Sequence, residues 1–246
     1  MAGIAAERQE KGFIDLINRA IKQNKNNPIT LIVGRIIITN VTGAMKYSGR
    51  QVSGSEPYTD VVLKIGKKEF CNISMKGKEA PSMAGGGLRG IELAAPGLGR
   101  RYFQQVHEYL VNKEKLRSGD KVPDIYGKIP KSVLKTIVVG NAKMGGPLDF
   151  IFIGPMNVSG RYDTKKNILY INRTFFHEAD TYAKTHDLYF RLRARRIDQR
   201  FDPTAKDERG IPKIYGKSPS KGDNVGRLVI VNEDAVPVNA KVINIR

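Results

Sequence analysis

The sequence Asp60-Val-Val-Leu-Lys-Ile65, then Gly66-Lys-Lys68, then Glu69-Phe-Cys-Asn-Ile-Ser-Met-Lys76 reads as two short strands joined by a turn. Apolar and β-branched residues fill the first run, and a three-residue connection that contains glycine is typical of a β-hairpin. Because side chains alternate along a strand, the second run should place Phe70, Asn72, Ser74 and Lys76 on one face and Cys71, Ile73 and Met75 on the other. The first face is unusually polar, and pairing of the strands would bring Asp60 toward Ser74 and Lys76. A solvated outer face is the alternative explanation of these polar side chains.

The segments around this hairpin predict a mixture of helices and strands. Apolar residues recur at helical spacing in Ile4–Asn24, which leads into a β-branched run at Ile29–Thr39. A Gly/Ser-rich loop is expected over Gly43–Pro57, and an irregular segment that is not a plain helix is expected over Gly77–Gly99. Helical spacing returns in Arg100–Arg117. Further strands are expected at Thr136–Gly140, Asp149–Ile153, Asn167–Asn172, Leu188–Arg195, Gly226–Asn232 and Val238–Ile245.

The predicted fold class is therefore α/β, of the α+β type with a mixed sheet. The order of the elements divides the chain into a core at residues 1–120 and a basic, strand-rich region at residues 121–246, which can pack as one body with that core. A chain of 246 residues is long enough to bury a substantial hydrophobic core without covalent cross-links. Cys71 is the single cysteine, so an intrachain disulfide framework and a multi-cysteine zinc site are excluded, and a reducing compartment is expected.

The charge of the chain points to a polyanionic partner. The sequence contains 42 Lys and Arg against 24 Asp and Glu, a formal net charge of +18. Nucleic acid is the first candidate, DNA before RNA, because basic surfaces gain affinity by releasing the counterions of phosphate chains. A membrane partner is not expected, since the longest apolar stretch, Leu31–Ile38, is short and contains Arg35. The acids within Met1–Glu10 do not fit a secretory leader, so the expected location is the cytoplasm, that of a host if the protein is viral, or a virion.

The hairpin resembles the core of the PD-(D/E)XK nuclease superfamily, the restriction-endonuclease-like fold. The resemblance covers roughly residues 1–115 and depends on Thr59-Asp60-Val-Val-Leu63 and Ile73-Ser-Met-Lys76. In that family an aspartate on one strand and an acid-x-lysine on the next bind a divalent metal and position the attacking water. The resemblance implies that Asp60 is the metal-binding aspartate, that Lys76 is the lysine, and that Mg²⁺ or Mn²⁺ is the cofactor. The strings Ile73–Gly77 and Ala80–Gly87 also resemble proteins encoded by tailed bacteriophages.

One position departs from the family pattern. Ser74 stands where the family has Asp or Glu, and a hydroxyl is a far weaker ligand for Mg²⁺ than a carboxylate. Related folds supply a carboxylate from the first helix, which makes Glu10 and Glu7 the candidates for the second acid, with Asp60 and Glu10 as the expected metal ligands. The alternative is that both glutamates are solvated acids of the first helical turns.

Two basic segments are candidates for contact with nucleic acid. Residues 188–221 hold ten Lys and Arg against four Asp and Glu. Strand alternation within this segment would point Tyr189, Arg191, Arg193 and Arg195 outward, next to Arg196, so that the arginines follow phosphates while Tyr189 stacks on a base or sugar. Arg89 follows three consecutive glycines, Gly85 to Gly87, whose backbone could approach a phosphate closely. A solvated sheet face and a flexible surface loop are the respective alternatives.

Two functions remain open on the sequence alone. The first is a metal-dependent endonuclease that hydrolyses DNA phosphodiester bonds. The second is a non-catalytic nucleic-acid-binding or phage virion protein that keeps the fold and the charge and has lost the metal site at Ser74. Folds of this kind often work as dimers, so a homodimer is compatible with either function.

Overall fold

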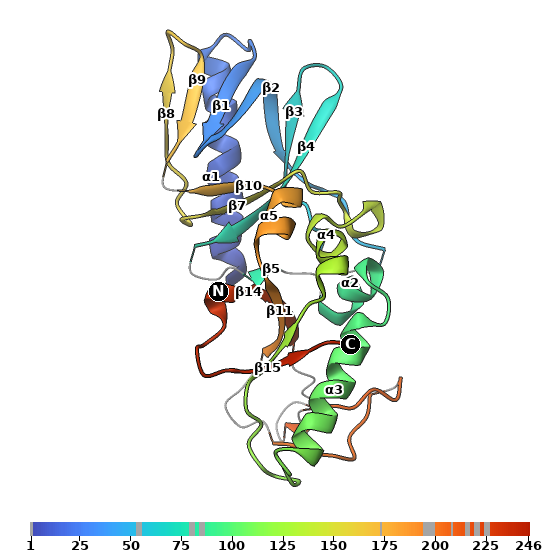
Figure 1. Cartoon of the computed structure of the whole chain (residues 1–246). Helices are drawn as coiled ribbons and strands as arrows, with labels where there is room; N and C mark the ends of the chain where they lie inside the picture. The colour runs from blue at the N-terminus through green and yellow to red at the C-terminus, as the bar shows by residue number, and fades with distance from the viewer. Residues whose placement is uncertain are drawn as a thin grey trace. The chain divides into compact units, whose positions relative to one another are not determined.

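The computed structural model describes residues 2–52, 56–78, 82–83, 87–172, 174–193, 200–207, 209–214, 217–218, 222–223 and 227–246. The chain divides into two compact units, and each unit is built from two separate segments. Unit 1 comprises Met1–Pro81 and Val138–Thr185, and unit 2 comprises Ser82–Ile137 and His186–Arg246. Figure 1 shows the elements of both units coloured along the chain.

Unit 1 is built on a mixed sheet with the strand order β10-β7-β4-β3-β2-β1-β9-β8. Its elements are α1 (Ala2–Gln23), β1 (Ile29–Val33), β2 (Ile36–Lys46), β3 (Val61–Ile65), β4 (Glu69–Gly77), the 3-10 turn η1 (Ala142–Met144), β7 (Phe150–Gly154), β8 (Gly160–Asp163), β9 (Ile168–Ile171), β10 (Phe175–Glu178) and α5 (Ala179–Thr185). β1 to β4 pair antiparallel in chain order, whereas β7 pairs parallel with β4 and β9 pairs parallel with β1. The predicted hairpin is confirmed, with Val61 opposite Ile73 and Ile65 opposite Glu69.

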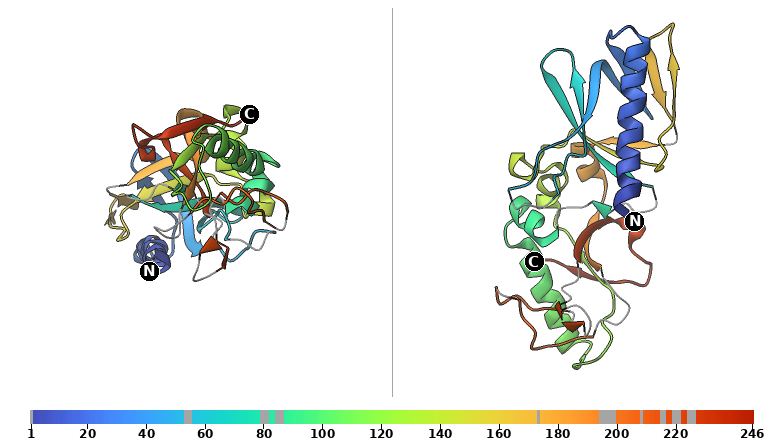
Figure 2. Two further views of the ribbon diagram at one scale, coloured as in Figure 1. Left: turned by 90° about the horizontal axis from the view of Figure 1, so that it is seen from below. Right: turned by 180° about the vertical axis from the view of Figure 1, so that it is seen from behind.

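Helix α1 covers one face of this sheet, as the right view of Figure 2 shows. Phe13, Ile17, Ala20 and Ile21 recur every three to four residues, which brings them to one side of the helix, and all four are buried in the core of unit 1. Cys71, Ile73 and Met75 belong to the same core, so β4 alternates as expected, with its polar residues on the other side. The helix ends at Gln23, where Lys25 and Asn26 adopt left-handed backbone conformations.

Two expectations for unit 1 differ from the structure. The β-branched run Ile29–Thr39 is interrupted by a turn at Gly34 and Arg35 and forms the hairpin of β1 and β2. Gly34 has φ of +60°, a conformation that glycine adopts at little cost. The loop expected from Gly43 begins later, because β2 continues to Lys46 through its pairing with β3.

Unit 2 contains a five-stranded sheet with the order β15-β6-β11-β14-β5. Its elements are β5 (Ser82–Met83), α2 (Gly87–Ala94), α3 (Leu98–Asn112), β6 (Ile125–Lys128), β11 (Leu188–Arg193), β12 (Lys217–Ser218), β13 (Gly222–Asp223), β14 (Arg227–Asn232), the 3-10 turn η2 (Glu233–Ala235) and β15 (Lys241–Asn244). Helix α4 (Lys131–Val139) also belongs to unit 2, except for its last two residues, which fall in unit 1. α3 packs on this sheet through Tyr102, whose ring lies 5.5 Å from that of Phe190 and whose hydroxyl donates to the carbonyl of Ile125 at 2.7 Å.

Two predictions are wrong for segments that lie in unit 2 or run from unit 2 into unit 1. The segment Gly77–Gly99 was expected to lack a helix but contains α2, which buries Gly90, Ile91 and Ala94 on one side. The expected strand Thr136–Gly140 is the end of α4, in which Leu134, Ile137 and Val138 are buried at helical spacing. In both segments the packing of an apolar helix face outweighed the local glycine or β-branched preference.

The boundaries of the two units differ from the expected division of the chain into residues 1–120 and 121–246. β7, β8, β9 and β10 lie beyond residue 120 in the sequence, yet they extend the sheet that holds β1 to β4. The parallel pairing of β7 with β4 causes this return, because parallel neighbours require a long connection, and here that connection contributes a segment of unit 2. The mixed α/β class of the chain is confirmed.

Candidate functional site

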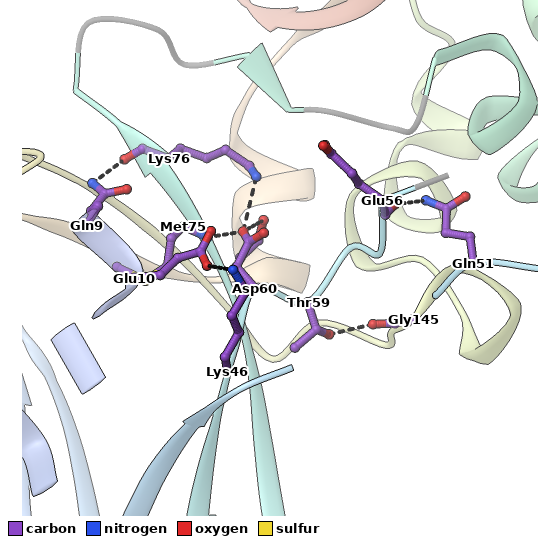
Figure 3. A network of polar contacts seen from close by, with 11 residues as sticks. Gln9, Glu10, Lys46, Gln51, Glu56, Thr59, Asp60, Met75, Lys76 and Gly145 are labelled. Carbon is purple, nitrogen blue, oxygen red and sulfur yellow. Dashed lines mark hydrogen bonds and ion pairs between the residues drawn. The ribbon is translucent and has the colours of Figure 1, made fainter. Parts of the chain in front are cut away.

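Asp60 precedes β3, and its carboxylate accepts three hydrogen bonds from the end of β4. Its Oδ2 atom lies 3.1 Å from the hydroxyl of Ser74, 2.6 Å from the backbone nitrogen of Met75 and 3.4 Å from Nζ of Lys76. The register of the hairpin explains these contacts, because Val61 is opposite Ile73 and Asp60 therefore lies beside the residues that follow Ile73. Figure 3 shows Asp60 with Met75 and Lys76 around it.

The backbone on both sides of Asp60 is fixed as well. Its N–H donates to the carbonyl of Ile73 at 2.9 Å, and its carbonyl accepts from the N–H of Tyr47 at 3.0 Å. The neighbouring Thr59 is fully buried, and its hydroxyl donates to the carbonyl of Gly145 at 2.5 Å. Asp60 is therefore held in position from both strands that adjoin it and from the loop that precedes β7.

Asp60 and Lys76 form an ion pair that is shielded but still reaches solvent. Their side chains are 22% and 15% exposed. Charges in such a position are screened by salt less than surface charges are, and they remain accessible to a ligand. Asp60 and Lys76 thus lie on the same side of the hairpin, as the sequence predicted.

Glu10 of α1 directs its carboxylate toward Asp60 and Lys76 (Figure 3). Its Oε2 atom is shielded from solvent and lies 3.0 Å from Nζ of Lys46, the last residue of β2. The Glu10 side chain is 13% exposed, whereas that of Lys46 is 61% exposed. We refer to Glu10, Lys46, Asp60 and Lys76 as the acid–lysine cluster.

The charges of the acid–lysine cluster act on one another. Burial raises the pKa of Glu10 above its usual value, against the lowering effect of the hydrogen bond from Lys46, and the negative charge of Asp60 raises this pKa further. The pKa of Lys46 is also raised, chiefly by its hydrogen bond to Glu10. The two partners differ because Glu10 loses much of its hydration and Lys46 loses little. Glu10 is therefore a carboxylate that further positive charge would stabilise.

Gln9 fixes the first turns of α1 against the ends of two strands. This buried side chain donates from Nε2 to the carbonyl of Gly154 at 2.9 Å and to those of Lys76 and Pro155 at 3.2 Å each. Its neighbour Glu10 is thereby held close to Lys76. Sequence reasoning did not identify Gln9, although a signal was present: Gln9, Phe13 and Ile17 are spaced four apart, so Gln9 is a polar residue within an apolar helix face.

The donor set of the acid–lysine cluster suits a hard divalent cation. Mg²⁺ is commonly held by one or two carboxylates together with several waters, and Asp60 and Glu10 supply two carboxylates. Burial raises the pKa of Glu10, so a cation bound beside it would stabilise its carboxylate. In the part of the chain that the structure describes, no group of three or more His, Cys, Asp or Glu side chains is placed to hold a metal. The carboxylates of Asp60 and Glu10 are oxygen ligands of the kind that Mg²⁺ and Mn²⁺ take together with water.

The other candidates near this site take different positions. Ser74 is buried and donates its hydroxyl to Asp60. Glu7 is exposed one turn before Glu10 and acts on the cluster through its charge, which helps to raise the pKa of Lys46. Lys46 was not identified from the sequence, because its role depends on a contact between β2 and α1.

The candidate nucleic-acid residues belong to unit 2 and are described separately from the cluster. Leu188, Phe190 and Leu192 are buried, and Tyr189 and Arg191 are partly exposed, as the alternation predicted. An acid does, however, pair with this stripe: Nη2 of Arg191 lies 2.9 Å from Oδ2 of Asp124. The Arg191 guanidinium also lies 5.7 Å from the centre of the Tyr126 ring.

The remaining basic candidates are only partly described. Arg89 is exposed on α2. Arg193 is the last residue of β11, and its side chain lies outside the described part. Arg195, Arg196, Gly85 and Gly86 also lie outside the described residues.

Comparisons with known proteins leave the family of this chain open. No protein-family model, no curated protein and no solved structure matches it. Within the described ranges, each helix is too short or too polar to cross a lipid bilayer.

Proposed function

We propose that this protein is a metal-dependent nuclease that hydrolyses phosphodiester bonds of DNA, with a restriction-endonuclease-like core in unit 1. The observation that supports this proposal is the convergence of Glu10, Asp60 and Lys76 from a helix and two paired strands. The net charge of +18 favours a polyanionic substrate.

Each residue of the cluster has a distinct part in this proposal. Asp60 and Glu10 would hold Mg²⁺ or Mn²⁺, which when bound neutralises phosphate charge and makes water a better nucleophile. Lys76 places an ammonium group beside the reacting phosphate and stabilises the negative charge that develops in the transition state. Ser74 and the backbone N–H of Met75 keep the Asp60 carboxylate in one orientation.

The proposal is tested by cleavage of supercoiled plasmid and labelled oligonucleotides with Mg²⁺, with Mn²⁺ and with EDTA. We expect metal-dependent cleavage that falls at least about a hundredfold in Asp60→Asn and Lys76→Met, the usual scale for loss of a group that stabilises transition-state charge. Asp15→Asn and Lys68→Met are the matched controls, because these exposed residues of α1 and the β3–β4 turn carry the same charges. Cleavage that persists in both cluster variants would refute the assignment.

A non-catalytic nucleic-acid-binding protein is the second candidate, and Ser74 favours it. The hydroxyl of Ser74 occupies the position of the second acid and donates a hydrogen bond instead of offering a carboxylate. Under this alternative, binding weakens as salt concentration rises, and no cut product forms with either metal. The cleavage assay run in parallel with anisotropy titrations separates the two functions.

A further inference from the structure

The acid–lysine cluster contains two carboxylates and two ammonium groups, so its formal charges cancel. Asp60 is paired with Lys76 and Glu10 with Lys46. A divalent cation that joined all four groups would add two positive charges at short range to both lysines. One ammonium group therefore has to move away when a metal binds, and the structure distinguishes which one can.

Lys46 is the lysine that is able to leave. Its side chain is 61% exposed, so its ammonium group can move into water with little loss of hydrogen bonding. Lys76 is 15% exposed, and its partner Asp60 is fixed by the backbone N–H of Met75. Glu10 is held by the helix that Gln9 anchors, so it remains in place when its partner moves.

We propose that Lys46 occupies the position of the cation beside Glu10 in the metal-free protein and that a divalent metal displaces it on binding. This inference rests on the proposed metal-dependent function. It makes Lys46 a positioning residue: its ammonium pairs with the shielded Oε2 of Glu10 before metal arrives, and it competes with the metal for this atom. The affinity of the site for metal is then set partly by a residue that is not a ligand.

The test is Mn²⁺ binding in the absence of nucleic acid, measured by titration calorimetry and by the electron paramagnetic resonance signal of free Mn²⁺. Lys46→Met removes the charge and keeps most of the apolar stem. We expect it to bind Mn²⁺ about three- to fivefold more tightly than the wild-type protein, the upper range for release from a partly exposed ion pair. The increase in melting temperature caused by Mn²⁺ should also be larger in this variant.

Two further variants make each outcome decisive. Lys68→Met loses the same charge at an exposed turn and should leave Mn²⁺ affinity within about twofold of wild type, as expected of a largely screened distant charge. Asp60→Asn should abolish the binding. If Mn²⁺ binding depends on Asp60 but is unchanged or weaker in folded Lys46→Met, the displacement of Lys46 is refuted and the proposed function stands. If no protein binds Mn²⁺, or binding is insensitive to Asp60→Asn, the metal site and the inference are both refuted.

Discussion

The hydroxyl of Ser74 donates a hydrogen bond to Oδ2 of Asp60 at 3.1 Å, so a neutral donor on β4, and not a second carboxylate, adjoins Asp60. This contact removes the repulsion that two adjoining carboxylates would have in metal-free protein. It also leaves the cluster dependent on α1 for its second carboxylate.

Replacing Ser74 by aspartate should therefore lower the stability of the metal-free protein and increase the stabilisation that a bound metal provides. Ser74→Asp places a buried carboxylate against Asp60, and we expect the free energy of unfolding to fall by about 1–3 kcal/mol in EDTA. Mn²⁺ should recover most of this loss, as measured by urea unfolding with and without the metal. Ser74→Asn is the uncharged control of similar size. Equal Mn²⁺ effects in the two variants would contradict a metal position beside Asp60.

The buried amide of Gln9 should be important for both stability and catalysis. Gln9→Leu removes this donor from the carbonyls of Lys76, Gly154 and Pro155, so we expect a loss of about 1–3 kcal/mol in urea unfolding. The carbonyl of Gly154 keeps its hydrogen bond from the N–H of Lys78. Cleavage should fall as well, because Glu10 loses its anchor. Gln23→Leu, at an exposed position of the same helix, should change stability by less than about 0.5 kcal/mol. A Gln9→Leu protein as stable as that control would show that the three contacts contribute little.

Glu10 should reduce the stability of the metal-free protein at neutral pH. Its pKa is higher in the folded than in the unfolded chain, so the folded state binds more protons, and stability decreases as the pH rises from about 4.5 through the raised pKa. Glu10→Gln removes this dependence. We expect the variant to be more stable than wild type near pH 7, by up to about 1 kcal/mol, and the difference to vanish near pH 4.

Urea unfolding in EDTA at the two pH values checks this expectation. Asp15→Asn serves as a control acid on the exposed side of the same helix. Lower stability of Glu10→Gln at neutral pH would mean that attraction between Glu10 and Lys46 outweighs the cost of burying the carboxylate.

In unit 2, Asp124 should limit the affinity of β11 for nucleic acid. Asp124→Asn releases Arg191 from its 2.9 Å ion pair, and we expect DNA to bind about two- to threefold more tightly at low salt. Arg191→Met should weaken binding and lower the slope of log affinity against log salt by about 1, since one phosphate contact is lost. Fluorescence anisotropy over a range of salt concentrations measures both effects. Identical slopes for Arg191→Met and the wild-type protein would exclude Arg191 from the interface.

The elements that sequence reasoning identified correctly are those in which local periodicity and packing agree. Phe13, Ile17 and Ile21 recur at the spacing of a helix, and α1 buries them together. The β3–β4 hairpin has a short turn between two runs that alternate, and this register alone places Asp60 beside Lys76. The prediction failed at α4, where Ile137 and Val138 favour a strand locally but complete a buried helix face together with Leu134.

The rest of the site depends on contacts between distant segments. Glu10 was a candidate because of a resemblance, while its partner Lys46 follows from the packing of α1 on β2. The contacts of Gln9 require β7, which lies about 145 positions further along the chain. The spacing of residues along the sequence does not predict such long-range contacts, because these contacts depend on the strand order of the folded sheet.

The amide of Gln9 also implies an order of events during synthesis. Two of its three acceptors are the carbonyls of Gly154 and Pro155, so this set of contacts is complete only after these residues have been translated. A nascent chain that ends before this point carries Asp60 and Lys76 but lacks the fastening that holds Glu10 beside them. The contacts that hold Glu10 near Asp60 and Lys76 are therefore completed late in synthesis, after more than half of the chain has been translated.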